Sequence, residues 1–172
     1  MIKICLQGGT KTQRDITERA ARYFIKRLCP RKRNLDLDIN IRNLLIEDAA
    51  GYCLYIGGNE FEVELHNRGS LYEYLSYLAH ELVHLKQYVR KDLKTRGYRN
   101  WWLNEEWSGG SYYQQPWEKE AFALQYPLAK DFIDDELQIT YKRAKELSPR
   151  TMKKLDLDME YRVLERTCDA QQ

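Results

Sequence analysis

The chain has 172 residues, of which 43% are hydrophobic and 31% charged, with only 9 Gly and 4 Pro. This balance predicts one globular domain with a substantial core and excludes a disordered or collagen-like chain. The formal net charge of +2 indicates no general affinity for nucleic acid or anionic membranes. Four scattered cysteines without a C-x-x-C pair, and no apolar run of membrane-spanning length, favour a soluble protein of the reducing cytoplasm.

The first 66 residues predict a small sheet with one helix against it. In chain order we expect a strand at 2–6, a helix over about 15–28, and strands at 35–42, 52–56 and 61–66. Strand 35–42 is the clearest, because apolar and polar residues alternate along it and one of its faces is therefore buried. Gly57-Gly58-Asn59-Glu60 is typical of a hairpin turn. The arrangement expected from these elements is an antiparallel meander.

Helices dominate the rest of the chain. Ser70 and Glu73 form a capping box, which predicts a long helix from there to about Lys94. An aromatic, glycine-punctuated stretch at 97–115 predicts a hairpin or an ordered loop. Pro116 suits the first position of a helix, expected over about 116–134, and Ser148-Pro149 precedes a last helix to Glu165. We expect a single domain, with its core at about 1–136 and a helical extension at about 137–172.

The sequence His80-Glu81-Leu82-Val83-His84 is an H-E-x-x-H motif inside the predicted long helix, which is the context that the motif requires. Residues four apart lie one turn above each other, so both imidazoles can direct a nitrogen to one Zn²⁺. Glu81 is rotated by about 100° around the helix axis, away from the metal but within reach of a water beside it. A carboxylate there can accept the proton of that water.

A catalytic zinc site needs a third protein ligand and one open position. No H-x-x-G-x-x-H continuation follows His84. The best candidates are the carboxylates at the start of the next helix, Glu118 and Glu120, while His66 on strand 61–66 is a weaker one. Ala121, one turn on, would allow the two helices to approach closely. Residue types alone do not separate Glu118 from Glu120.

A helical H-E-x-x-H motif followed by Glu-x-x-Ala resembles the gluzincin metallopeptidases. The pair H-E-L-V-H-x-x-Q-Tyr and Pro-Trp-Glu-x-Glu-Ala is similar to small metallopeptidase-like proteins of bacteriophages, to minigluzincins and to peptidase domains of the ImmA/IrrE type. This resemblance implies that Glu118 is the third zinc ligand and that Glu120 has a supporting role. It also implies an α+β zincin-like fold, in which a mostly antiparallel sheet is backed by the H-E-x-x-H helix and crossed by the glutamate helix. Phe122 stands where these families usually have an acidic or amide residue.

The resemblance further implies a zinc endopeptidase that cuts polypeptides, located in the host cytoplasm if a phage encodes it. Zincins bind substrate along an edge strand, and by that likeness strand 61–66 would be the docking edge. Gln87, one turn beyond His84, is a candidate for orienting a histidine. Tyr112, Tyr113 and His66 are open candidates for stabilising an oxyanion.

Two other functions are considered. A zinc-stabilised structural or binding protein would keep the metal site without turnover, although it would have no need of Glu81. A DNA-associated protease of the SprT type would use the basic cluster Lys26, Arg27 and Arg31–Arg33, but the paired cysteines of its zinc ribbon are missing. We expect this cluster to be a solvated helix end, and Trp101, Trp102 and Trp107 to pack the aromatic connection.

Overall fold

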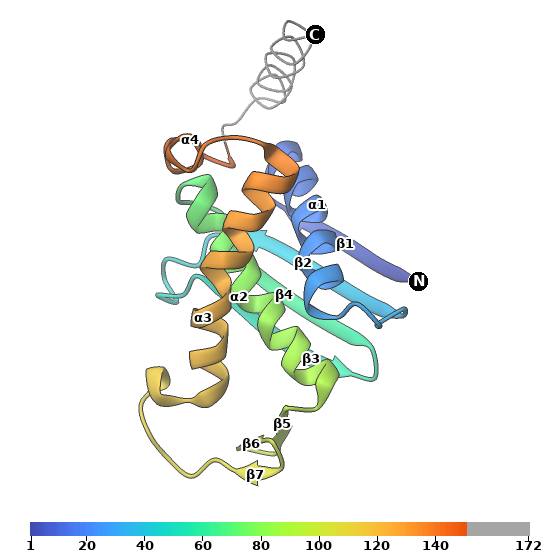
Figure 1. Ribbon diagram of the computed structural model, residues 1–172. Coiled ribbons are helices and arrows are strands. Elements are labelled where there is room, and N and C mark those ends of the chain that lie inside the picture. Colours follow the sequence, from blue (N-terminus) through green and yellow to red (C-terminus); the bar gives the residue numbers. More distant parts are fainter. Residues whose placement is uncertain (151–172) are drawn as a thin grey trace, which may run out of the picture.

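The computed structural model describes residues 1–150 and contains a four-stranded mixed sheet (Figure 1). The strand order is β1-β2-β4-β3, and the strands are β1 (Ile2–Gly8), β2 (Leu35–Arg42), β3 (Gly51–Gly57) and β4 (Glu60–His66). The β3–β4 pair is antiparallel, which confirms the predicted hairpin. However, β1 pairs with β2 and β2 with β4 in parallel, so the expected mostly antiparallel meander is wrong.

The connections explain why the sheet is mixed. Helix α1 (Lys11–Leu28) carries the chain from β1 back to the start of β2, and such a crossover produces parallel strands. After β2 the chain forms β3 at the sheet edge before β4 fills the place beside β2. Alternating burial occurs in parallel and antiparallel strands alike, so the pattern of strand 35–42 does not show whether its neighbours run parallel or antiparallel to it. Helix α1 begins earlier than expected because Thr10 and Gln13 form a capping box.

The central helix is α2 (Leu71–Arg90), and Ser70 and Glu73 form the predicted capping box at its start. It ends four residues earlier than expected, where Lys91 adopts a left-handed conformation at φ 63°. Helix α3 (Pro116–Phe132) begins at Pro116 as predicted and continues into a π-helical turn over 133–137. The short helix α4 (Tyr141–Glu146) lies in the region expected to be a helical extension, although no separate helix was predicted there. Most of the helix expected over 148–165 lies outside the described residues.

The predicted aromatic hairpin is confirmed as a second, three-stranded antiparallel sheet of β5 (Leu93–Arg96), β6 (Arg99–Trp102) and β7 (Glu105–Glu106). It projects from the end of α2, away from the main sheet (Figure 1). The rings of Trp102 and Trp107 lie 6.5 and 6.0 Å from that of buried Trp117 at the start of α3. The tryptophans therefore join this sheet to α3, as their expected packing role requires.

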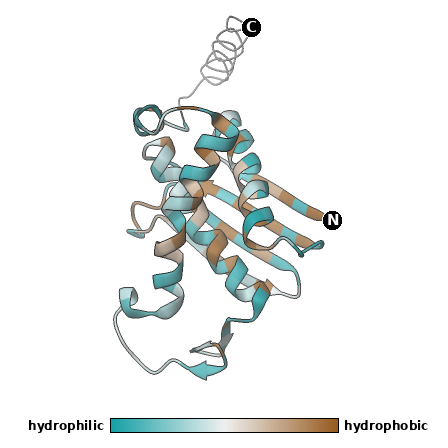
Figure 2. Cartoon of the chain, viewed as in Figure 1, coloured by the Kyte–Doolittle hydropathy of each residue, from teal (hydrophilic) through white to brown (hydrophobic). Residues whose placement is uncertain are grey.

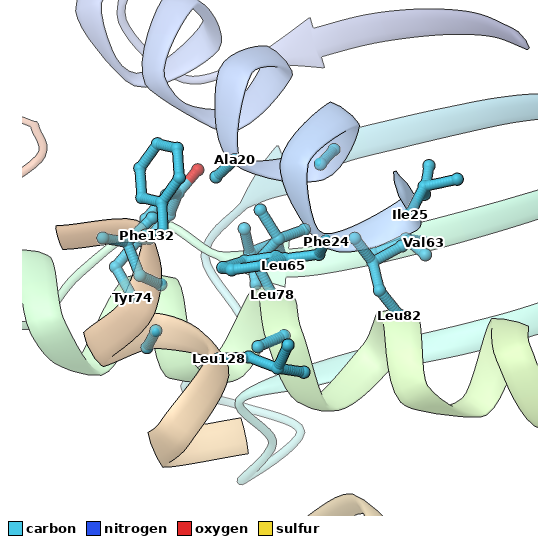
Figure 3. Close-up of a cluster of buried hydrophobic side chains, with 14 of the residues drawn as sticks. Ala20, Phe24, Ile25, Val63, Leu65, Tyr74, Leu78, Leu82, Leu128 and Phe132 are labelled. Atoms are coloured by element: carbon cyan, nitrogen blue, oxygen red, sulfur yellow. The ribbon is translucent and has the colours of Figure 1, made fainter. Parts of the chain in front are cut away.

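The hydrophobic core lies between the main sheet and helices α1 and α2, and continues between α2 and α3, which packs on α2 (Figure 1). The inward residues of β2, Leu35 to Ile41, are at most 2% exposed. Figure 2 shows the corresponding alternation of hydrophobic and hydrophilic residues along the strands. Phe24 of α1, Leu78 of α2 and Phe132 of α3 converge on Leu65 of β4 (Figure 3). Burial of such side chains stabilises the fold by about 1.5–3 kcal/mol each.

The molecule is thus an α+β protein with a small mixed sheet backed by α2, against which α3 packs in turn. Within residues 1–150, no helix combines the length and apolar character needed to cross a membrane. The pair α2–α3 determines where the predicted site residues lie.

Candidate metal centre

Helix α2 carries His80, Glu81 and His84 in its buried middle. These residues retain 7%, 5% and 8% exposure respectively. The spacing of four brings the two imidazoles together, with ring centroids 4.8 Å apart, and their Nε2 atoms are separated by 3.2 Å. Both nitrogens therefore point toward one spot beside the helix.

Helix α3 brings Glu118 to the same spot. One Glu118 carboxylate oxygen lies 3.1 Å from His80 Nε2, and the other lies 3.4 Å from His84 Nε2. Ala121, one turn further, is fully buried, so a small side chain stands where the helices approach. His80, His84 and Glu118 together lie close enough to hold a metal ion.

The other two candidates for a third ligand lie elsewhere. Glu120 accepts hydrogen bonds from Lys86 and Gln87, on a different side of α3 from Glu118. His66 accepts the backbone N–H of Leu44 through Nδ1 at 2.9 Å. Neither belongs to the group of metal-ligating atoms found among the described residues.

Each histidine is fixed by a glutamine on its far side. His84 Nδ1 lies 2.8 Å from Gln87 Oε1, as predicted for Gln87. His80 Nδ1 lies 2.7 Å from Gln125 Oε1 on α3, a contact that was not predicted from the sequence. A carbonyl oxygen only accepts hydrogen bonds, so both rings carry a proton on Nδ1, and Nε2 is the nitrogen left to bind a metal. This is the tautomer that a metal-binding imidazole requires.

Gln125 has a signal in the sequence that could have revealed it. Glu118, Ala121 and Gln125 follow helical spacing on one face of α3, and all three are buried. Phe122, next to this face, packs its ring against His80, with 4.8 Å between the ring centroids. The group that orients His80 is thus Gln125, three positions beyond Phe122.

The electrostatics separate the roles of the two carboxylates. Burial raises the pKa of Glu81 to about 7, with His84 and His80 opposing this effect. Burial would also raise the pKa of Glu118, but its close contacts with the imidazoles of His80 and His84 lower it to about 2. Glu118 is therefore a permanent anion between the histidines, whereas Glu81 can gain and lose a proton near neutral pH.

A cavity of about 640 Å³ opens over these residues. The β3 residues Gly51–Cys53 form one of its walls, and Glu81 lies against this wall, since a Cβ atom on Gly51 would be 2.8 Å from its carboxylate. The lining is rich in tyrosine and contains no Lys or Arg within residues 1–150; the tyrosines are Tyr52, Tyr77, Tyr88, Tyr112, Tyr113 and Tyr126. An extended segment with aromatic or aliphatic groups could therefore reach the three-residue cluster.

Only two of the three candidates for oxyanion stabilisation lie at the cavity. Tyr112 and Tyr113 line it, whereas His66 does not. Burial raises the pKa of Tyr112, and its hydrogen bond with Glu118 raises it further. The Tyr112 hydroxyl is therefore a neutral donor close to the cluster.

The expected docking edge, strand 61–66, is wrong. Strand β4 is paired on both sides, with β2 and with β3. The strand that borders the cavity is β3, which is also the edge of the main sheet. The hairpin was predicted correctly, but which of its two strands lies outermost depends on the parallel pairing of β4 with β2.

The basic cluster is partly engaged in contacts within the fold. Arg27 forms ion pairs with Asp131 of α3 at 3.2 Å and with Asp135 of the π-helical turn at 2.7 Å. Lys32 donates a hydrogen bond to Asn59 at 2.6 Å. These contacts agree with the expectation of a solvated helix end.

No protein-family model matches the chain, and neither the curated proteins nor the solved structures include a match to it. What can be said of function therefore depends on the geometry of the site.

Proposed function

We propose that this protein is a zinc-dependent metallopeptidase that hydrolyses peptide bonds in polypeptide substrates. The observation that carries the proposal is the convergence of His80, His84 and Glu118 beside a buried Glu81, at the floor of an accessible cavity. The H-E-x-x-H spacing and the resemblance to gluzincins support the same chemistry.

Two nitrogens and one carboxylate are a ligand set typical of catalytic zinc. In a tetrahedral site with bonds of about 2.0–2.1 Å, the ligand atoms lie roughly 3.3 Å from one another. The separations of 3.2 Å between the two Nε2 atoms, and of 3.1 and 3.4 Å to the carboxylate oxygens, are close to this value. The residues present therefore fit a zinc ion without rearrangement of α2 and α3.

When bound, zinc would polarise the scissile carbonyl and lower the pKa of a water molecule. Glu81 then accepts a proton from the attacking water and transfers it to the leaving amine. Its raised pKa suits this exchange, because a carboxylate that titrates near 7 can both take and return a proton at neutral pH. Tyr112 donates a hydrogen bond to the oxyanion that develops at the carbonyl.

We place the substrate along β3. This edge strand borders the cavity, and an extended polypeptide can add to such an edge through main-chain hydrogen bonds. Its scissile bond then lies over Glu81, since Gly51 of β3 is in contact distance of this carboxylate.

The proposal is tested with the zinc-loaded chain and its Glu81→Gln variant on unfolded protein substrates. Glutamine keeps the shape of the side chain but cannot accept the proton, so we expect cleavage to fall roughly 10²- to 10⁴-fold. Zinc content should remain the same in both proteins.

The alternative is a zinc-binding structural protein that uses the same three ligands without turnover. It predicts equal, negligible cleavage by the wild type and by Glu81→Gln, with zinc bound to both. This result across a broad set of unfolded substrates would reject the peptidase.

A further inference from the structure

The two glutamines that hold the histidines differ in what their own amide nitrogens contact. Gln125 Oε1 meets His80 Nδ1, and no hydrogen bond of the Gln125 amide nitrogen is found within residues 1–150. Gln87 Nε2, by contrast, donates both to the backbone carbonyl of Trp117 and to Glu120 Oε2, each at 2.9 Å. Gln87 is fully buried, so these two acceptors decide which way its amide faces.

Glu120 is itself held by a buried cation. Lys86 Nζ lies 2.5 Å from Glu120 Oε1, and the lysine side chain is only 6% exposed. The pair thus leaves the second carboxylate oxygen of Glu120 aimed at Gln87. A buried ion pair adds little net stability, but here it holds a carboxylate oxygen within hydrogen-bond distance of the Gln87 amide nitrogen.

We propose that Lys86 and Glu120 are positioning residues that fix the amide of Gln87, and through it the tautomer of His84. The chain of contacts runs from Lys86 to Glu120, to Gln87 Nε2, and from Gln87 Oε1 to His84 Nδ1. It holds the proton on Nδ1 and keeps the Nε2 lone pair for the metal. This inference rests on the metal site of the proposed function.

This chain of contacts, here called the relay, gives the two glutamines different hydrogen-bonding requirements. Gln125 only accepts a hydrogen bond from His80, so a carboxylate can replace it without loss of that bond. Gln87 must accept on one side and donate on the other. In Gln87→Glu a second carboxylate would face both Glu120 and the carbonyl of Trp117, and would be repelled by both.

The test measures zinc affinity of the full chain by chelator competition. We expect Gln87→Glu to raise the zinc Kd roughly 10- to 100-fold, as is usual when the group orienting a metal-binding histidine is lost. Gln125→Glu should raise the zinc Kd much less than Gln87→Glu does, because the acceptor for His80 Nδ1 is retained. Glu120→Ala should raise the Kd about tenfold. Gln7→Glu on exposed β1 adds the same charge far from the site and is the control.

A second readout distinguishes the relay from a purely structural role. Nitrogen-15 spectra of the imidazoles, recorded without metal and well above the ordinary imidazole pKa, report which ring nitrogen of His84 is protonated. We expect Nδ1–H in the wild type and a tautomer mixture in Gln87→Glu and Glu120→Ala. The double variant Gln87→Glu/Glu120→Gln should recover part of both readouts, because glutamine at 120 can donate to glutamate at 87.

The relay is overturned if His84 keeps its Nδ1 proton and its zinc affinity in Gln87→Glu and Glu120→Ala, or if Gln125→Glu is as damaging as Gln87→Glu. A wild type that binds no zinc would instead contradict the proposed function. In that case the tautomer of His84 in the metal-free variants still decides the relay.

Discussion

Gly51 allows a direct test of the position of Glu81. This glycine begins β3, and a Cβ atom built on it would lie 2.8 Å from both Cγ and Oε1 of Glu81, and 2.9 Å from the backbone oxygen of Glu64. Ordinary contacts of a Cβ atom begin at 3.4 Å. In Gly51→Ala, Glu81 must therefore move by about 0.6 Å or more, the difference between 3.4 and 2.8 Å, because the Glu64 backbone blocks retreat on the other side.

A displacement of about 1 Å in a catalytic group can cost roughly 10²-fold in rate. We therefore expect Gly51→Ala to lower kcat/KM on an unfolded protein substrate by roughly 10- to 100-fold. Zinc affinity should change by less than about twofold, because His80, His84 and Glu118 do not contact the added methyl group.

Gly109→Ala is the matched control, because nothing lies within 4 Å of a Cβ atom there and its backbone is not in the left-handed region. Full activity of Gly51→Ala would refute the packing of Glu81 against β3. Loss of zinc together with activity would show that the substitution damages the whole site.

The remaining predictions concern the metal ligand, the oxyanion donor and pH. Glu118→Ala should abolish zinc binding at micromolar metal. Lys119 is exposed on α3 beside it, and the Lys119→Ala protein should bind zinc as the wild type does. Equal zinc affinities of the two variants would contradict the ligand set. Tyr112→Phe should lower kcat roughly 10- to 100-fold, in the direction expected for loss of an oxyanion donor, and Tyr113→Phe should change it little; the reverse ranking would exclude Tyr112. In chelator, burial keeps the pKa of Glu81 near 7, above its unfolded value of 4.5. The folded chain then holds a proton that the unfolded chain has released, so the free energy of unfolding falls as pH rises from about 4.5 to 7, by an order of 3 kcal/mol. Chemical denaturation of Glu81→Gln should lack this fall, and an identical pH profile in both proteins would contradict the burial argument.

Local signals predicted the elements of the site well. The capping box of Ser70 and Glu73 fixed the start of α2, and Pro116 fixed the start of α3. The H-E-x-x-H spacing required the two histidines to share a helix face, since positions four apart lie on one side. These features depend on neighbours in the sequence and on little else.

The choice between Glu118 and Glu120 depended on which face of α3 meets α2. Positions two apart point about 200° away from each other around a helix, so only one of these carboxylates can reach the histidines. The row 118, 121, 125, 128 and 132 is buried, and it contains Glu118. The helical spacing of this row is visible in the sequence. However, it includes the polar residues Glu118 and Gln125, so it does not look like a buried face.

The topology of the sheet could not be predicted in the same way. Alternation in β2 shows that one face is buried, but it contains no information on strand direction or on the order of neighbours. The parallel pairing of β2 with β4 is a long-range choice, and it decides that β3, not β4, borders the cavity. The error in the docking strand follows from this one missing fact.

The central claim is that His80, His84 and Glu118 bind one zinc ion and leave one position open. Anomalous diffraction at the zinc absorption edge, from crystals of the zinc-loaded chain, tests it most directly. We expect a single strong peak about 2.0–2.2 Å from both Nε2 atoms and a Glu118 oxygen, with no fourth protein ligand. A peak elsewhere, no peak, or a fourth side chain on the metal would contradict it.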